Sequence, residues 1–491
     1  MKPDFLRTPV ARRSFLADCG MGFTGLALGS MLHRDGIARA ATAGWQPPNG
    51  LPHFAPKAKR VIWLFMIGGV SHVETFDPKP ELNKYAGRQL SDTPYQKVLD
   101  NPFTKRNVRE VIDGLHTIHP LIYPMQVGFS KRGQSGIEVS DWWPNVGECI
   151  DDIAVVRSLW TTDNNHGAQM QFHSGRHVLE GQFPTIGAWV HYGLGSLNEN
   201  LPQFVVLGEP IDTCCGGVAA HGAAYLGPEH DGVRLEVRPE NPLPYSQPGP
   251  GVPQEQQKSE FELLGQFNRL STVQYPDDLA MRARIKSYEL AFRMQTAVPE
   301  VMRFSEESEG MRRLYGLDNE VTKPFGEMCL AARRLAETGV RFVQVFHGQN
   351  GGAGKWDAHA NLKKGHSELC AQVDKPIAGL LRDLKQRGMF DDTLVVFATE
   401  FGRTPGAQGT NGRDHHPYGF SVWLAGAGIK GGTVHGATDE LGFHAVENRH
   451  YVTDIHATVL HQLGLDARRL EVPGRKRLDI DFGEKIQAIL V

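Results

Sequence analysis

The chain has 491 residues, 40% of them hydrophobic and 22% charged, a composition that excludes collagen-like, coiled-coil and wholly disordered proteins. The formal net charge of -3 disfavours nucleic-acid binding, because proteins that bind nucleic acid are usually basic. Histidine is abundant, with 21 residues, and it is the commonest metal-binding side chain. The positions of the histidines therefore decide the functional interpretation.

The N-terminal residues have the three parts of a bacterial twin-arginine signal. Arg12 and Arg13 precede a mostly apolar stretch at 20–32, and small residues up to Ala43 offer cleavage sites. The apolar stretch is shorter than the roughly 20 residues that span a bilayer. We expect residues 1–43 to be a signal peptide that the twin-arginine translocase recognises. The mature protein should then be periplasmic or extracellular, with no membrane span.

The rest of the chain alternates short apolar runs with amphipathic segments. Expected strands lie at 60–67, 153–159, 203–207, 341–346, 393–398 and 420–424, and expected helices lie at 276–298, 324–338, 366–387 and 453–463. The runs are rich in Val, Ile and Phe, as buried parallel strands are. The pattern predicts a single α/β domain over 44–491, with a mostly parallel central sheet sandwiched by helices. Residues 227–260 are rich in Pro, Gln and charge, and we expect a surface insertion there.

Polar residues that follow the first expected strand are candidates for a site, because open α/β sheets bind ligands at the carboxyl ends of their strands. The paired glycines at 68 and 69 permit a tight turn, and Ser71, His72, Glu74 and Asp77 follow as candidate ligands. The alternative for each of them is a capped loop. His166 comes after the second expected strand, among small polar residues.

Two later strands are followed by acidic and imidazole side chains. Asp357 and His359 form an Asp-x-His pair after the strand at 341–346, a mixture that suits zinc, manganese or another borderline divalent ion. Glu400 directly follows the strand at 393–398 and needs a metal or a cation to be buried there. His415 and His416 precede the strand at 420–424. Together these positions predict a divalent-metal site, the alternative being core and surface histidines that bind no metal.

Several longer stretches follow one another in order: FMIGGVSHVETFDPKP, GQSGIEVSDWWPN, NNHGAQMQFHSGRHV, GKWDAHANL, TEFGRTP and GRDHHPYGFSVWLAGAGIKGG. In this order they resemble the bacterial family called domain of unknown function 1501, over about residues 59–465. That family is similar to the alkaline phosphatase and sulfatase superfamily. The resemblance implies a parallel sheet between helices, with metal ligands at strand ends.

The resemblance also implies roles for single residues. Asp357 and His359 are similar to the superfamily's Asp and His zinc ligands, and Glu400 keeps the carboxylate of a later Asp-His pair, so His415 or His416 would supply the imidazole. The sequence departs from the sulfatase pattern where Gly68 and Gly69 stand in place of two adjacent aspartates. It also has no Cys/Ser-x-Pro-x-Arg motif, from which a sulfatase nucleophile is matured.

These patterns support two functional hypotheses. The first is an exported hydrolase of phosphate or sulfate esters that uses a divalent ion (Zn, Mn or Ca). Its nucleophile would be metal-activated water or Ser71, His166 would act in catalysis, and Arg403, Arg413 or Arg176 would bind the anion. The second is a non-catalytic protein on the same scaffold that binds a metal or a sulfated glycan. The expected ligand is a small anionic ester or a sulfated glycan, not nucleic acid.

Overall fold

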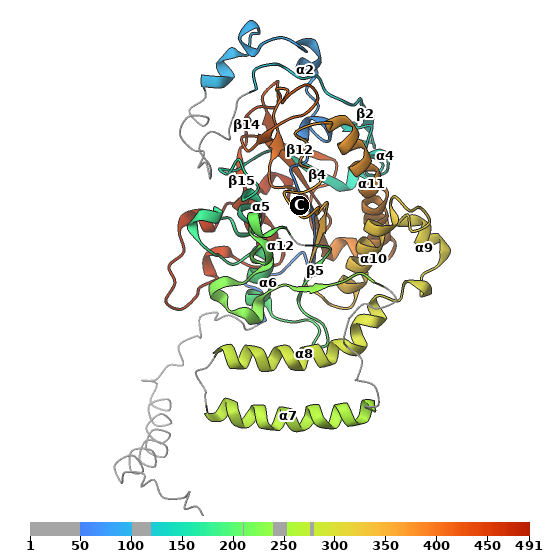
Figure 1. Ribbon diagram of the computed structural model, residues 1–491, viewed down its shortest axis with the longest axis vertical. Helices are drawn as coiled ribbons and strands as arrows, with labels where there is room; N and C mark the ends of the chain where they lie inside the picture. Colours follow the sequence, from blue (N-terminus) through green and yellow to red (C-terminus); the bar gives the residue numbers. More distant parts are fainter. Residues whose placement is uncertain (1–49, 101–118, 210, 239–252, 275–278) are drawn as a thin grey trace, which may run out of the picture. The chain divides into compact units, whose positions relative to one another are not determined.

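The computed structural model describes residues 50–100, 119–209, 211–238, 253–274 and 279–491 (Figure 1). The expected signal peptide at 1–43 lies outside the described residues. Within the described part of the chain, no helix combines the length and the apolar character needed to cross a membrane.

A nine-stranded sheet forms the centre of the fold, in the order β12-β4-β11-β8-β1-β7-β5-β6, with β15 beside β4. Its strands are β1 (Arg60–Met66), β4 (Ile153–Trp160), β5 (Phe204–Leu207), β6 (Val233–Leu235), β7 (Phe342–His347), β8 (Thr393–Ala398), β11 (Phe420–Ala425), β12 (Thr433–His435) and β15 (His450–Tyr451). All neighbours pair in parallel except β11, which is antiparallel to both β4 and β8. The predicted α/β fold with a mostly parallel sheet is therefore confirmed.

Helices cover both faces of this sheet (Figure 1). One face carries α10 (Lys323–Glu337) and α11 (Leu362–Gln386), and the other carries α5 (Ala168–Ser174), α6 (Ile186–Leu194) and α12 (Val452–Gln462). The further helices and strands are α2 (Pro80–Lys84), α4 (Pro144–Gly147), α7 (Gln254–Gln274), α8 (Leu279–Val301), α9 (Glu309–Leu314), β2 (Phe129–Arg132), β3 (Ile137–Ser140), β9 (Gly402–Arg403), β10 (His415–His416), β13 (Ala437–Thr438) and β14 (Ala445–Glu447). Within residues 227–260, β6 is an edge strand of the sheet and α7 begins at Gln254.

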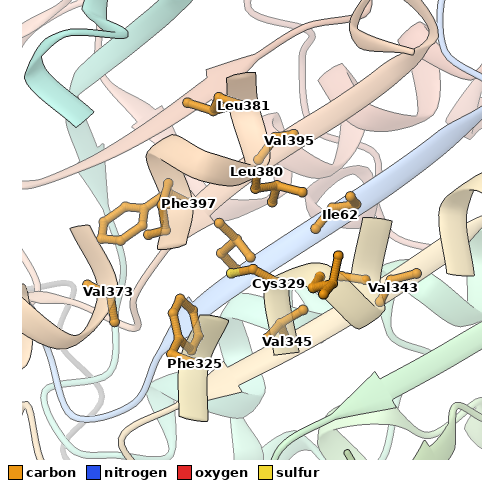
Figure 2. Packing of buried hydrophobic residues seen from close by; sticks show 14 of the residues in the cluster. Ile62, Phe325, Cys329, Val343, Val345, Val373, Leu380, Leu381, Val395 and Phe397 are labelled. Carbon is orange, nitrogen blue, oxygen red and sulfur yellow. The ribbon is translucent and has the colours of Figure 1, made fainter. Parts of the chain in front are cut away.

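Strand β1 shows why the sequence forms a buried central strand. Its side chains alternate between the two faces of the sheet. Ile62 belongs to the cluster with Cys329 of α10 and Leu380 of α11 (Figure 2), whereas Trp63 packs against Phe172 of α5. Because both faces are covered, the strand is apolar throughout instead of alternating with polar residues.

The direction of the strands brings the candidate residues to one edge. The carboxyl ends of β1, β4, β7 and β8 share that edge, and the reversed β11 places its amino end there as well. At this edge Gly68 has φ 123°, and a Cβ atom on it would lie 2.5 Å from the backbone nitrogen of Asp357. Only glycine allows the turn after β1 to approach the segment after β7 so closely.

Candidate metal centre at the carboxyl edge of the sheet

Four side chains from three strand ends form one cluster: His166 after β4, Asp357 and His359 after β7, and His415 in β10. Their candidate ligand atoms all lie within 4.8 Å of one another. Asp357 Oδ1 is 2.9 Å from His359 Nε2 and 3.1 Å from His415 Nε2, and Asp357 Oδ2 is 3.3 Å from His166 Nε2. The three imidazoles therefore point their Nε2 atoms at a single carboxylate.

The other ring nitrogen of each histidine faces an oxygen acceptor. His166 Nδ1 lies 3.0 Å from Glu400 Oε1, His415 Nδ1 lies 2.7 Å from the carbonyl oxygen of Asn164, and His359 Nδ1 contacts the side-chain oxygen of Gln408. When the rings are neutral, as a bound metal requires, these partners place the proton on Nδ1 and leave a lone pair on Nε2. Without a metal, a protonated ring can also donate from Nε2 to Asp357. Metal-binding histidines are held in the same way by acceptors behind them.

This arrangement brings electron-rich atoms together. His359 Nε2 and His415 Nε2 are 3.0 Å apart, and both face the ionised Asp357. Two lone pairs and a carboxylate repel one another at this distance unless a proton or a metal cation lies among them. The cluster therefore has the chemistry of a cation site.

Burial and the nearby carboxylates together set the pKa values at the cluster. Burial opposes ionisation of Asp357, but its hydrogen bonds with the three histidines and the charge of Arg403 outweigh burial and hold its pKa well below the usual range. The hydrogen bond with Asp357 raises the pKa of His359. Burial lowers the pKa of His166, yet Asp357 and Glu400 together raise it overall. Burial lowers the pKa of His415 to about 4, so this ring is neutral and ready to act as a ligand at pH 7.

The cluster opens to solvent on one side. The side chain of His359 is 38% exposed, whereas that of His166 is only 6% exposed. A ligand from solution would therefore reach the cluster beside His359.

Glu400 lies behind the cluster. It is fully buried, and Oε1 accepts hydrogen bonds from the backbone N–H of Gly68 at 2.9 Å and from His166 Nδ1 at 3.0 Å. The backbone N–H of Gly68 also lies 3.2 Å from Oε2. Glu400 thus orients His166 and joins it to the turn after β1.

Other residues predicted for the site have different partners in the structure. Ser71 donates a hydrogen bond to the carboxylate of Glu74, which also forms a buried ion pair with Arg413 at 2.7 Å. His72 Nε2 lies 2.8 Å from the carbonyl oxygen of Gly442. His416 faces the carbonyl oxygen of Phe443, and its ring stacks on that of His72 with centroids 6.2 Å apart.

Among the residues in contact with the cluster, Asn164, Gln408 and Asp414 were not predicted as ligands from the sequence. Asn164 binds His415 through its backbone carbonyl, so its side-chain type gives no signal. Gln408 lies in the connection between β9 and β10, away from any predicted strand end. Asp414 directly precedes His415, and its Oδ1 is 3.5 Å from His359 Nδ1. Its position beside the His-His pair was the one available signal.

Residues 58–490 match the family described as "Protein of unknown function (DUF1501)", and the chain belongs to that family. An endo-4-O-sulfatase of Bacteroides thetaiotaomicron is 31% identical over 135 residues. The matched segment covers 26% of this chain and 25% of that protein, so it spans about a quarter of the relative.

Solved structures give weaker similarities. The PsFucS1 sulfatase of Pseudoalteromonas sp. matches with a TM-score of 0.30 and 15% identity, over 66% of this chain and 62% of that one. A protein in the alkaline phosphatase superfamily from Vibrio parahaemolyticus matches with a TM-score of 0.33 and 12% identity, over 79% of this chain and 80% of that one. The family predicted from the sequence motifs is confirmed by the match over residues 58–490.

Proposed function

We propose that this protein is a metal-dependent hydrolase of phosphate or sulfate esters. The observation that carries the proposal is the convergence of three imidazole Nε2 atoms on Asp357, each ring being held by an acceptor at Nδ1. A quarter of the endo-4-O-sulfatase is similar to this chain, which supports an ester as the class of substrate. Asp357, His359, His415 and His166 would hold one divalent ion.

The donor set favours Zn²⁺ or Mn²⁺ over Ca²⁺. Imidazole nitrogen suits zinc and other borderline ions, and a structural or catalytic zinc ion commonly takes four ligands. Calcium takes about 6–8 oxygen ligands, whereas this cluster offers a single carboxylate among its four residues.

When bound, a divalent ion would polarise the ester oxygen and lower the pKa of a water molecule towards neutrality. The residues of the chain do the rest of the work. Glu400 fixes the ring of His166, and Arg403 fixes the carboxylate of Asp357 at 2.7 Å. Ser71 is fully buried and donates to Glu74, which favours water over this hydroxyl as the nucleophile.

The test is to purify the protein without chelator, measure its metal content, and assay aryl sulfates and aryl phosphates. We expect about one equivalent of a transition metal and turnover of at least one ester class. A His359→Ala, His415→Ala double variant should lose both, whereas His461→Ala, which alters a histidine in contact with Phe54, should lose neither. Turnover by the double variant at the wild-type level would contradict the proposal.

A non-catalytic binding protein is the second candidate. It is favoured by Gly68 and Gly69 at the end of β1 and by the hydrogen bond that engages Ser71. Binding of a sulfated glycan without release of sulfate, by protein that contains its metal, would favour this candidate.

We also propose export by the twin-arginine pathway, on the basis of Arg12 and Arg13. Replacing both with lysine should leave the protein in the cytoplasm when cell fractions are compared. Unchanged export of that variant would contradict the proposal.

A further inference from the structure

The guanidinium groups assigned to anion binding are already engaged by the protein. Arg403 is fully buried. Its Nε donates to the carbonyl oxygen of Gly69 at 2.9 Å, its Nη1 donates to that of Arg413 at 3.3 Å, and its Nη2 pairs with Asp357 at 2.7 Å. Nη2 also contacts the carbonyl oxygens of Gly68 and Trp356. Arg403 therefore links the turn after β1 to Asp357 and has no N–H group directed at solvent.

Arg413 is held in the same way, and Arg176 forms two ion pairs that are partly buried. Arg413 is fully buried, pairs with Glu74, and donates to the carbonyl oxygens of Thr404 and Pro405 at 2.9 and 2.8 Å. Arg176 pairs with Asp481 at 2.5 Å and with Glu180 at 2.8 Å. An ester anion could gain one of these guanidinium groups only by breaking a buried or partly buried ion pair, which is unfavourable.

Carboxylates outnumber cations around the ligand imidazoles. Asp357, Glu400 and Asp414 each lie within 3.5 Å of a ring nitrogen of the cluster, and Arg403 is the guanidinium that balances them. One divalent ion would cancel the remaining negative charge and leave the site close to neutral.

We infer that this site selects ester groups that carry a single negative charge, such as sulfate monoesters and phosphate diesters, over doubly charged phosphate monoesters. The inference rests on the proposed function. In a near-neutral site whose neighbouring guanidinium groups are already paired, one added negative charge is accommodated more easily than two, because the second would be desolvated without a partner. The shared chemistry of the preferred substrates is a singly charged tetrahedral group.

Calorimetric binding to the zinc-loaded protein tests the inference without turnover. The probes are phenylphosphonate, which is doubly charged at pH 8.5, and its monomethyl ester, which is singly charged. We expect the monomethyl ester to bind several-fold more tightly at pH 8.5, and we expect the preference to shrink at pH 5.5, where both probes carry one charge. Equal or tighter binding of phenylphosphonate at pH 8.5 would overturn the inference.

A charge variant gives a second readout in the same protein. Asp414→Asn removes one negative charge while keeping an oxygen that can accept from the N–H of His415, and it should shift the ratio of the two affinities several-fold towards phenylphosphonate. Glu309→Gln, which neutralises an exposed acid on α9, should leave the ratio unchanged. A ratio that is unaffected by Asp414→Asn would overturn the inference.

Steady-state kinetics show whether the enzyme prefers sulfate monoesters or phosphate diesters. We expect kcat/KM for p-nitrophenyl sulfate or for methyl p-nitrophenyl phosphate to exceed that for p-nitrophenyl phosphate. The substrate with the higher kcat/KM of the first two identifies the preferred ester as a sulfate monoester or a phosphate diester. Faster hydrolysis of p-nitrophenyl phosphate would overturn the inference and keep the proposed function. No turnover of any of the three, with no binding of either probe, would overturn both.

Discussion

His415 and His416 follow one another in β10, yet they differ in what the protein does with their rings. His415 donates from Nδ1 to the carbonyl oxygen of Asn164 and turns Nε2 to Asp357. His416 turns Nε2 to the carbonyl oxygen of Phe443 and stacks on His72. Successive side chains of a strand point to opposite faces, so the pair is divided between two environments.

The partner of each ring nitrogen separates a candidate ligand from a structural histidine. In the cluster, acceptors engage Nδ1 and leave Nε2 directed at a carboxylate. In the second group, made up of Ser71, His72, Glu74, Arg413 and His416, the polar atoms bind one another or backbone carbonyls. The second group ties the turn after β1 to residues 413–443, which is a structural role.

The strongest test replaces each member of the His-His pair in turn. His415→Ala should reduce the metal content from about one equivalent to below about a tenth, because it removes a converging Nε2. His416→Ala should keep the metal and lose about 1–3 kcal/mol of unfolding free energy, because a buried ring and its hydrogen bond are removed. Metal analysis and urea unfolding measure both effects. Loss of metal from a folded His416→Ala protein would contradict a structural role for His416.

The second test concerns the ion pair between Glu74 and Arg413. Arg413→Met leaves Glu74 buried without its cation, and we expect a loss of about 3–5 kcal/mol in the free energy of unfolding. Adding Glu74→Gln should recover part of this loss, because no uncompensated charge then remains. The metal content of the folded protein should not change in either variant. If a folded variant lost its metal, the pair of Glu74 and Arg413 would have a role in metal binding.

The third test weakens the support behind one ligand. Glu400→Gln keeps the shape of the side chain but removes the charge that faces His166 Nδ1. We expect the affinity for zinc to fall by about 10–100-fold, the range usual for residues that orient metal ligands. Competition with a chromogenic chelator measures the change. An unchanged affinity would mean that His166 is not a ligand.

The last test concerns the pH dependence of stability that Asp163 contributes, in the loop that carries His166. Burial raises the pKa of this carboxyl from 3.8 to about 7, so the folded chain holds a proton that the unfolded chain releases. Stability should therefore fall as pH rises through that interval, by up to about 1.4 kcal/mol per pH unit. Asp163→Asn should remove this slope. Parallel pH profiles for the two proteins would contradict the assignment.

The fold was largely predictable from the sequence, because strands buried on both faces have continuous apolar runs. All six expected strands are present, and the expected helix at 366–387 corresponds to α11 at Leu362–Gln386. The reversed direction of β11 was not predictable, because an apolar run such as 420–424 has no direction of its own.

The candidate site was predictable only in part. Asp357, His359 and His415 lie beside strand ends, and the structure brings them together with His166. His72 and Glu74 also follow a strand, but the turn at Gly68 and Gly69 directs the chain away from the cluster. His72 contacts the carbonyl oxygen of Gly442, and Glu74 pairs with Arg413. Which side of a turn a residue occupies depends on backbone angles, and residue type alone does not encode them.

The central position of β1 has a consequence for how the protein acquires its metal. β1 lies between β7 and β8, which come more than halfway along the chain, so its pairing is dominated by contacts distant in sequence. Folds of such high contact order form slowly, because long loops must close first. The four ligand candidates are spread from residue 166 to residue 415. Selection of the metal would therefore fall to the assembled domain, in whichever compartment that assembly takes place.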